Sequence, residues 1–179
     1  YKIVPMPVGE GLSDLGLIGS IKEIFGPVWK SILLLWLVMV LRAFVGQSFV
    51  TFFPVLYSWE GHSLISVGLL VAIFTVAGSV SGLLAGHMAD RMGFKPVFYI
   101  THLLTPPCML LLLYLPGNWV YLGAMLAGFF VLATLPLGVT MAQKLAPGGK
   151  SMASSLMMGL AWGPGGVLTP VTGQLCDIF

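Results

Sequence analysis

One arginine stands alone inside a long hydrophobic segment, where its chemistry requires an explanation. Arg42 lies near the middle of the apolar stretch 28–57, and a charge at that depth in lipid is energetically costly. Such residues face a protein interior or an aqueous cavity, and a guanidinium offers five N–H donors that suit a carboxylate or phosphate. We expect Arg42 to contact an anionic substrate or an acidic residue on another helix. The alternative is a structural arginine bonded to backbone carbonyls.

Other polar side chains at similar depth are further candidates for lining a substrate cavity. Gln47 and Thr51 continue a polar track beyond Arg42, although hydrogen bonds to neighbouring helices also explain them. His102 lies about one turn inside the third hydrophobic segment, and His87 lies near the end of the second. Histidine titrates near neutrality, and the alternative for both is a packing role. The remaining cavity candidates are Thr105, Thr134 and Trp162.

Neither enzymatic nor metal chemistry is indicated. The three histidines are scattered, and Cys108 and Cys176 lack metal-ligand spacing, so we interpret both cysteines as apolar core residues. There is no basic stripe for nucleic acid. No Asp or Glu lies deep in a hydrophobic segment, so proton coupling requires a histidine or a carboxylate outside this chain. The sequence therefore predicts no metal, cofactor or nucleic-acid partner.

The composition indicates whether this chain folds in water or in a lipid bilayer. Hydrophobic residues make up 58% of the 179 residues and charged residues only 8%, against about 25% charged in a soluble domain. A lipid bilayer accommodates such a chain, and only helices or closed barrels satisfy the backbone there. The apolar segments are too long and uniform for barrel strands. We predict an all-α polytopic membrane helix bundle with spans at about 28–57, 64–88, 96–115, 119–145 and 151–176.

The basic residues divide unequally between the predicted loops. Seven of the eight fall on one side of the five spans, which the positive-inside rule makes cytoplasmic, and the eighth is Arg42. We expect a multi-pass protein of the plasma (inner) membrane. Residues 1–27 are expected to form a cytoplasmic linker with an amphipathic helix over Leu12–Phe25, lying on the membrane or against protein. The seven loop and linker residues are Lys2, Lys22, Lys30, Arg91, Lys95, Lys144 and Lys150.

Small residues and helix breakers are frequent within the predicted spans. Gly78, Gly82 and Gly86 recur every fourth residue and form a ridge that another helix can approach closely. Prolines and glycines are expected to interrupt spans three, four and five, as in transporters whose broken helices line cavities. Structural kinking is the alternative. These residues are Pro106, Pro107, Pro136, Gly163, Pro164, Gly165, Gly166 and Pro170.

The loop after the second span carries a longer motif. It reads Gly-His-Met-Ala-Asp-Arg-Met-Gly-Phe-Lys over residues 86–95. This resembles the cytoplasmic motif of major facilitator superfamily (MFS) transporters, Gly-x-x-x-Asp-(Arg/Lys)-x-Gly-Arg-(Arg/Lys). Phe94 departs where the family usually has arginine. The matching residues are Gly86, Asp90, Arg91, Gly93 and Lys95.

The resemblance implies an architecture for the rest of the chain. The five spans correspond to helices seven to eleven of twelve, so the chain looks like a fragment whose partners are an N-terminal half and a last helix of the same protein. In this family the motif holds the two halves together on the cytoplasmic side. The stretches 41–44, 51–54 and 163–166 also look like the fosmidomycin resistance protein group, which implies proton-driven export of an anionic, drug-like small molecule.

Other functions are compatible with the same sequence. One alternative is an MFS uptake transporter for a metabolite such as an organic anion or a sugar. Alternatives of another class are a non-transporting membrane scaffold or receptor and a polytopic membrane enzyme. An enzyme would need clustered nucleophiles, metal ligands or acid–base pairs, which the spans do not carry.

Overall fold

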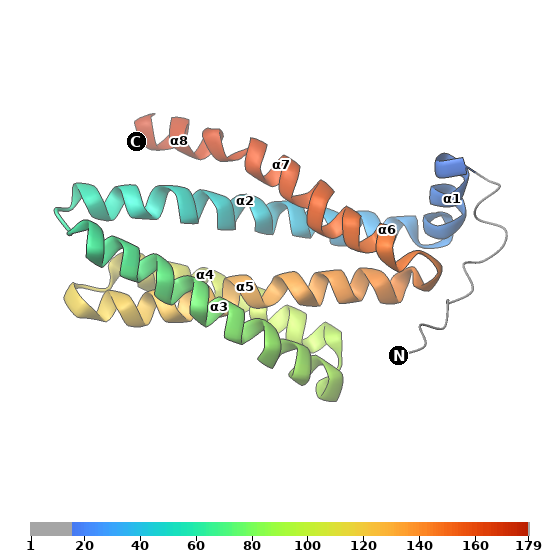
Figure 1. Cartoon of the computed structure of the whole chain (residues 1–179), viewed down its shortest axis with the longest axis horizontal. Helices are drawn as coiled ribbons and strands as arrows, with labels where there is room; N and C mark the ends of the chain where they lie inside the picture. Colours follow the sequence, from blue (N-terminus) through green and yellow to red (C-terminus); the bar gives the residue numbers. More distant parts are fainter. Residues whose placement is uncertain (1–15, 179) are drawn as a thin grey trace, which may run out of the picture.

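The computed structural model describes residues 16–178, and these residues are helical apart from short connections (Figure 1). Short turns of 3₁₀-helix at Gly26–Val28, Gly117–Trp119 and Pro147–Gly149 precede three of the helices, and a π-helical turn spans Leu156–Leu160. The α-helices are α1 (Gly16–Phe25), α2 (Trp29–Trp59), α3 (Leu64–Met92), α4 (Phe94–Tyr114), α5 (Val120–Leu145), α6 (Lys150–Ser155), α7 (Ala161–Val167) and α8 (Thr169–Ile178).

Four helical stretches are long and apolar enough to cross a membrane. They run up and down alternately, so that successive connections lie at opposite ends of the bundle (Figure 1). Because every backbone group inside such a helix pairs within its own segment, this arrangement is stable in lipid. The predicted all-α polytopic class is confirmed. The four stretches are Gly26–Trp59, Leu64–Met92, Phe94–Tyr114 and Gly117–Leu145.

The fifth hydrophobic segment differs from the uninterrupted spans. It consists of α6, the π-helical turn, α7 and α8, none of which alone is long enough to cross a membrane. The irregular positions are the π-helical turn Leu156–Leu160, which lies just before the glycine and proline cluster, and Leu168, which lies between Gly166 and Pro170. Gly163, Pro164, Gly165 and Gly166 all lie inside α7, and the Leu168 amide donates to the Pro164 carbonyl at 3.1 Å.

The prolines of spans three and four also fail to end their helices. Pro106 and Pro107 lie within α4, and Pro136 lies within α5, both of which are continuous. A proline removes one amide donor, but neighbouring packing in a membrane bundle compensates for that loss. The three prolines therefore do not divide α4 or α5 into separate helices.

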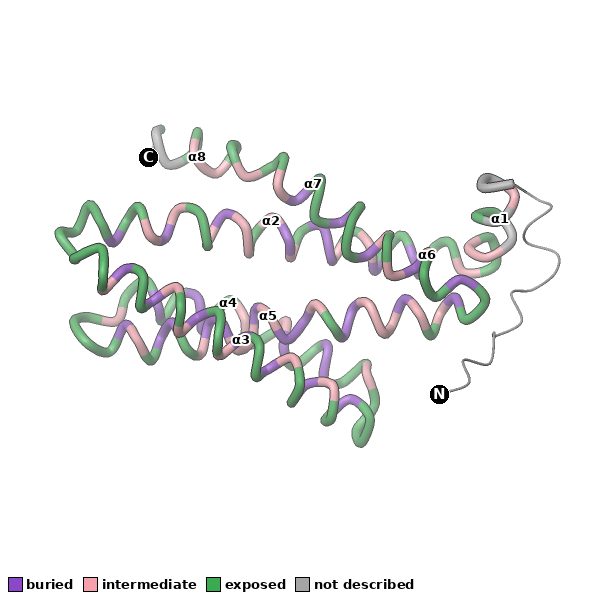
Figure 2. Tube along the Cα trace, viewed as in Figure 1, coloured by how far each residue is buried: buried purple, intermediate pink, exposed green. Residues whose placement is uncertain are grey.

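Helix α5 is the centre of the bundle. In the most apolar 18-residue segment of each long stretch, 50% of the segment that includes α5 is buried, against 28 to 33% for the other three. Figure 2 shows buried positions along the length of α5. Glycines make this packing possible. A Cβ added to Gly128 would lie 2.8 Å from Phe74 Cα of α3, and one added to Gly123 would lie 2.8 Å from Leu112 Cα of α4.

The buried side chains form two hydrophobic clusters along the bundle axis. One, near the α3–α4 connection, includes Met39, Leu137 and Met157. The other, toward the opposite end, includes Phe74 and Leu112. The hydrogen bonds of Arg42 lie where the two hydrophobic clusters adjoin, so a polar contact separates them.

The helix ends that carry basic residues gather at one end of the bundle (Figure 1). The α1–α2, α3–α4 and α5–α6 connections meet there, whereas the α2–α3 and α4–α5 connections lie at the other end and contain no Lys or Arg. At the basic end, α1 packs through Ile24 close to Gly149, while Ile21 and Lys22 are exposed. The predicted linker up to residue 15 lies outside the described residues.

Candidate functional site

Arg42 reaches from α2 to α5 and makes three hydrogen bonds there. Its Nε donates to Thr134 Oγ1 at 2.9 Å and to the Val131 carbonyl at 3.3 Å, and its Nη2 donates to the same carbonyl at 3.0 Å. Thr134 is buried, and its hydroxyl donates to Val131 O at 2.8 Å. The arginine therefore bonds to a backbone carbonyl, as the structural alternative expected, and to one of the predicted cavity residues.

His102 lies on α4, eight residues after that helix begins. Its Nδ1 lies 2.9 Å from the Phe98 carbonyl, and its ring lies against the Phe98 ring, with 4.1 Å between centroids. Its Nε2 is buried and has no hydrogen-bond partner among the described residues. Arg42 and Thr134 are therefore joined across two helices, whereas His102 is bonded within its own helix.

The other predicted cavity residues lie apart from this group. Trp162 is exposed on α7, Gln47 is half-buried, and Thr51 is exposed on α2. The Thr105 hydroxyl donates to the Thr101 carbonyl of its own helix at 2.7 Å. Of the predicted cavity residues, the structure therefore brings Arg42 and Thr134 into direct contact.

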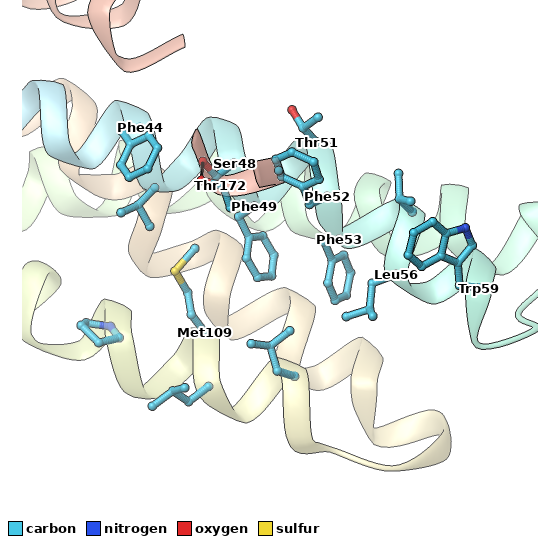
Figure 3. A pocket seen from close by; sticks show the side chains of 16 residues that line it. Phe44, Ser48, Phe49, Thr51, Phe52, Phe53, Leu56, Trp59, Met109 and Thr172 are labelled. Carbon is cyan, nitrogen blue, oxygen red and sulfur yellow. Dashed lines mark hydrogen bonds between the residues drawn. The ribbon is translucent and has the colours of Figure 1, made fainter. Parts of the chain in front are cut away.

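An open cavity of about 890 Å³ lies between α2, α4 and α8. Its wall is mainly aromatic and aliphatic. Figure 3 shows Phe49, Phe53 and Met109 pointing into the space between the helices, while the Thr51 hydroxyl points away from it. Of the predicted residues, Thr51 and Pro106 line this cavity, and Arg42 does not.

A second polar contact, which the sequence did not indicate, ties α8 to α2. The hydroxyls of Ser48 and Thr172 lie 2.9 Å apart at the cavity wall. Serine and threonine are common in membrane helices, so their types alone gave no signal of this pairing. The contact fixes the end of the interrupted fifth segment against the first long helix.

The motif loop joins α3 to α4 through a single glycine. Gly93 has φ of +93°, a conformation that residues with a side chain rarely adopt, which explains the glycine of the motif. Asp90, Arg91 and Lys95 are exposed, and no ion pair of Asp90 occurs among the described residues. Gly86 is half-buried, and a Cβ added there would meet nothing within 4 Å.

Phe94, the residue that departs from the motif, makes a cation–π contact with Lys144. The Lys144 ammonium at the end of α5 lies 3.7 Å from the centroid of the Phe94 ring. Such cation–π contacts stabilise neighbouring elements. This contact joins the motif loop to the end of α5, and spacing in the sequence could not have revealed it.

Comparison with known proteins places this bundle in a family. The model of the Major Facilitator Superfamily matches residues 7–176, nearly the whole chain. The chain therefore belongs to the Major Facilitator Superfamily, a family of integral membrane transporters, which confirms the resemblance of the motif loop.

Two curated relatives refine the comparison. The fosmidomycin resistance protein of Escherichia coli (strain K12) is 29% identical over 131 residues, which are 73% of this chain and 32% of that protein. The uncharacterized MFS-type transporter YfnC of Bacillus subtilis (strain 168) is 29% identical over 107 residues, which are 60% of this chain and 26% of that protein. The matched regions thus span about a third or less of these relatives.

Proposed function

We propose that the complete protein is a secondary active transporter that exports a small anionic molecule by alternating access, driven by a proton gradient. The observation that carries this proposal is Arg42, a cation held halfway along a membrane-spanning helix by Thr134 and Val131. The name of the Escherichia coli relative, a resistance protein, supports export of a drug-like compound.

The hydrogen bonds of Arg42 support an anion contact, because they do not use all of its donors. The hydrogen bonds described for its side chain use Nε and Nη2, while the guanidinium carries five N–H donors in all. Nη1 is therefore a donor that an oxyanion can accept from. The α2, α4 and α5 helices contain no Asp or Glu, so an anion meets no like charge on them.

We also propose that the basic end of the bundle faces the cytoplasm in the plasma (inner) membrane. The gathering of Arg91, Lys95, Lys144 and Lys150 at that end supports this orientation through the positive-inside rule. The motif loop then lies where it meets the other half of the transporter.

The test is drug accumulation in cells that express the complete gene product. Fosmidomycin and a panel of other small anions are measured with and without a proton uncoupler, against cells carrying the empty vector. Lower accumulation of one compound that the uncoupler reverses supports proton-driven export. Higher accumulation instead indicates the alternative of uptake, and no change for any compound contradicts the transport of small anions.

A further inference from the structure

The hydroxyl of Thr134 has a fixed role in the contact between α2 and α5. The side chain is buried, and its hydroxyl donates to the Val131 carbonyl, three residues earlier, at 2.8 Å. Threonine in a helix commonly forms this bond to a preceding carbonyl. Because the hydroxyl hydrogen is used there, the Thr134 oxygen meets Arg42 as an acceptor, and Arg42 Nε donates to it at 2.9 Å.

The Val131 carbonyl also accepts two N–H groups of Arg42. Nε lies 3.3 Å and Nη2 lies 3.0 Å from this oxygen. A guanidinium is planar and rigid, so two of its nitrogens that share one acceptor fix the direction in which the group points. Together with the Thr134 bond, this contact holds the Nε–Nη2 edge of Arg42 against α5. The guanidinium is therefore oriented as well as bonded.

The opposite edge of the guanidinium remains free. Nη1 makes no hydrogen bond with any described residue. The buried side-chain nitrogens that lack a partner in the described part of the chain belong to Trp36 and His102, so Nη1 is accessible. Nη2 has a second N–H on the side of Nη1. Two parallel N–H groups along this edge match the two oxygens of a carboxylate, phosphate or phosphonate.

The helices around this edge contain no acidic side chain that would compete for it. α2, α4 and α5 contain no Asp or Glu, and no ion pair of Arg42 occurs within residues 16–178 as described. The α2 and α5 helices lie close together here, since a Cβ added to Gly46 would lie 3.8 Å from Val131 Cγ1. A cation without an acidic partner inside a membrane bundle favours an anionic ligand.

We propose that Thr134 is a positioning residue for Arg42, and that the Nη1–Nη2 edge which it orients binds an oxyanion through two oxygens, as in a carboxylate or a phosphonate. Thr134 acts through Arg42, because its hydroxyl is already bonded to Val131 and to Nε. Without the hydroxyl, Nε loses its shorter bond, and the guanidinium can turn about its side-chain bonds. This inference rests on the proposed function and names the class of anion and the residue that orients its donor.

The first experiment measures binding and does not require transport. The purified complete gene product is titrated with methylphosphonate, or with chloride at the same ionic strength, and the thermal midpoint reports binding. We expect methylphosphonate to raise the midpoint more than chloride does. In Thr134→Val the dissociation constant for methylphosphonate should rise roughly tenfold, as expected for a lost hydrogen bond to a charged group. Thr134→Ser, which keeps the hydroxyl, and Thr140→Val, the matched control, should bind like the unsubstituted protein.

Equal binding of methylphosphonate by Thr134→Val and by the unsubstituted protein overturns the positioning role. A loss that Thr134→Ser does not restore also overturns it, because the hydroxyl would then not be responsible. Equal effects of chloride and methylphosphonate on the unsubstituted protein overturn the two-oxygen contact.

Spectra of the unsubstituted protein test the geometry even if Thr134→Val does not fold. Nitrogen-15 resonances of labelled arginine are assigned by comparison with Arg42→Lys, and methylphosphonate is then added. We expect the Nη1 and Nη2 resonances of Arg42 to shift more than its Nε resonance, because Nε stays bonded to Thr134. A shift of Nε alone, or of none of the three, overturns the inference.

Transport kinetics separate positioning from a purely structural role. In liposomes, with the anion selected by the accumulation assay, Thr134→Val should raise the substrate concentration for half-maximal flux roughly tenfold. The maximal flux per folded protein should stay the same. An unchanged half-saturating concentration with less folded protein would assign Thr134 a structural role only and overturn the inference. An unsubstituted protein that binds methylphosphonate but moves no anion contradicts the proposed function instead, and the binding result still supports the inference.

Discussion

At the scale of single residues, Arg42 connects sequence to structure most directly. Its charge inside an apolar segment was visible from the sequence. The sequence could not predict its main acceptor, the Val131 carbonyl. Every residue carries a backbone carbonyl, and only the packing of α2 against α5 brings this one within reach of Arg42. His102 was recognised as titratable, yet its unpaired Nε2 depends on three-dimensional surroundings that spacing does not encode.

Replacement of Arg42 tests its role in transport. We expect Arg42→Ala to reduce transport to the background while the protein still inserts into the membrane, because removal of the guanidinium removes the anion donor. Arg42→Lys should also be impaired, since one ammonium cannot reproduce the two-nitrogen contact with Val131. Substrate flux and the amount of membrane-inserted protein are measured together, and normal flux in Arg42→Ala would exclude the role.

Thr134→Val tests the contact between α2 and α5 without changing side-chain shape. It removes the acceptor of the Arg42 Nε bond, and we expect a loss of about 1 kcal/mol in stability, within the range found for such bonds in membranes. Thr140→Val is the matched control, because that hydroxyl bonds only to Pro136 of its own helix. Unfolding of the purified protein measures both, and equal stabilities would show that the Arg42 bond contributes nothing.

At the scale of the elements, the sequence predicted the long helices and pointed to the interrupted fifth segment, but not to its π-helical turn. Pro116, Gly117 and Asn118 marked the turn between α4 and α5, because no long apolar helix could continue through them. Gly165 of α7 has a packing role that the sequence did not indicate. A Cβ on Gly165 would lie 2.7 Å from the Ala43 Cβ of α2, so this glycine permits close helix packing and does not end the helix.

Gly128→Ala tests the close approach of α3 and α5. The added Cβ would lie 2.8 Å from Phe74 Cα, which forces the two backbones apart, and overpacking of this kind costs about 1–3 kcal/mol. The yield of folded protein and its thermal midpoint should both fall. Gly68→Ala, where a Cβ meets nothing within 4 Å, should keep or raise stability. Identical behaviour of the two variants would refute this packing.

At the scale of the whole molecule, the account depends on which end of the bundle faces the cytoplasm. In a cysteine-free background, Asn118→Cys should react with a membrane-impermeant thiol reagent applied to intact cells, and Gly148→Cys only after permeabilisation. Both positions are exposed and lie at opposite ends of α5. The reverse pattern of labelling would invert the proposed topology.

Flux through the purified protein tests the proposal that this bundle forms part of a proton-driven transporter. The complete gene product is placed in liposomes with a labelled anion selected by the accumulation assay, and a pH gradient is imposed across the membrane. The account predicts uphill movement of the anion that stops when an uncoupler collapses the gradient. Anion movement that is unaffected by the gradient, or no movement beyond that in protein-free liposomes, would contradict it.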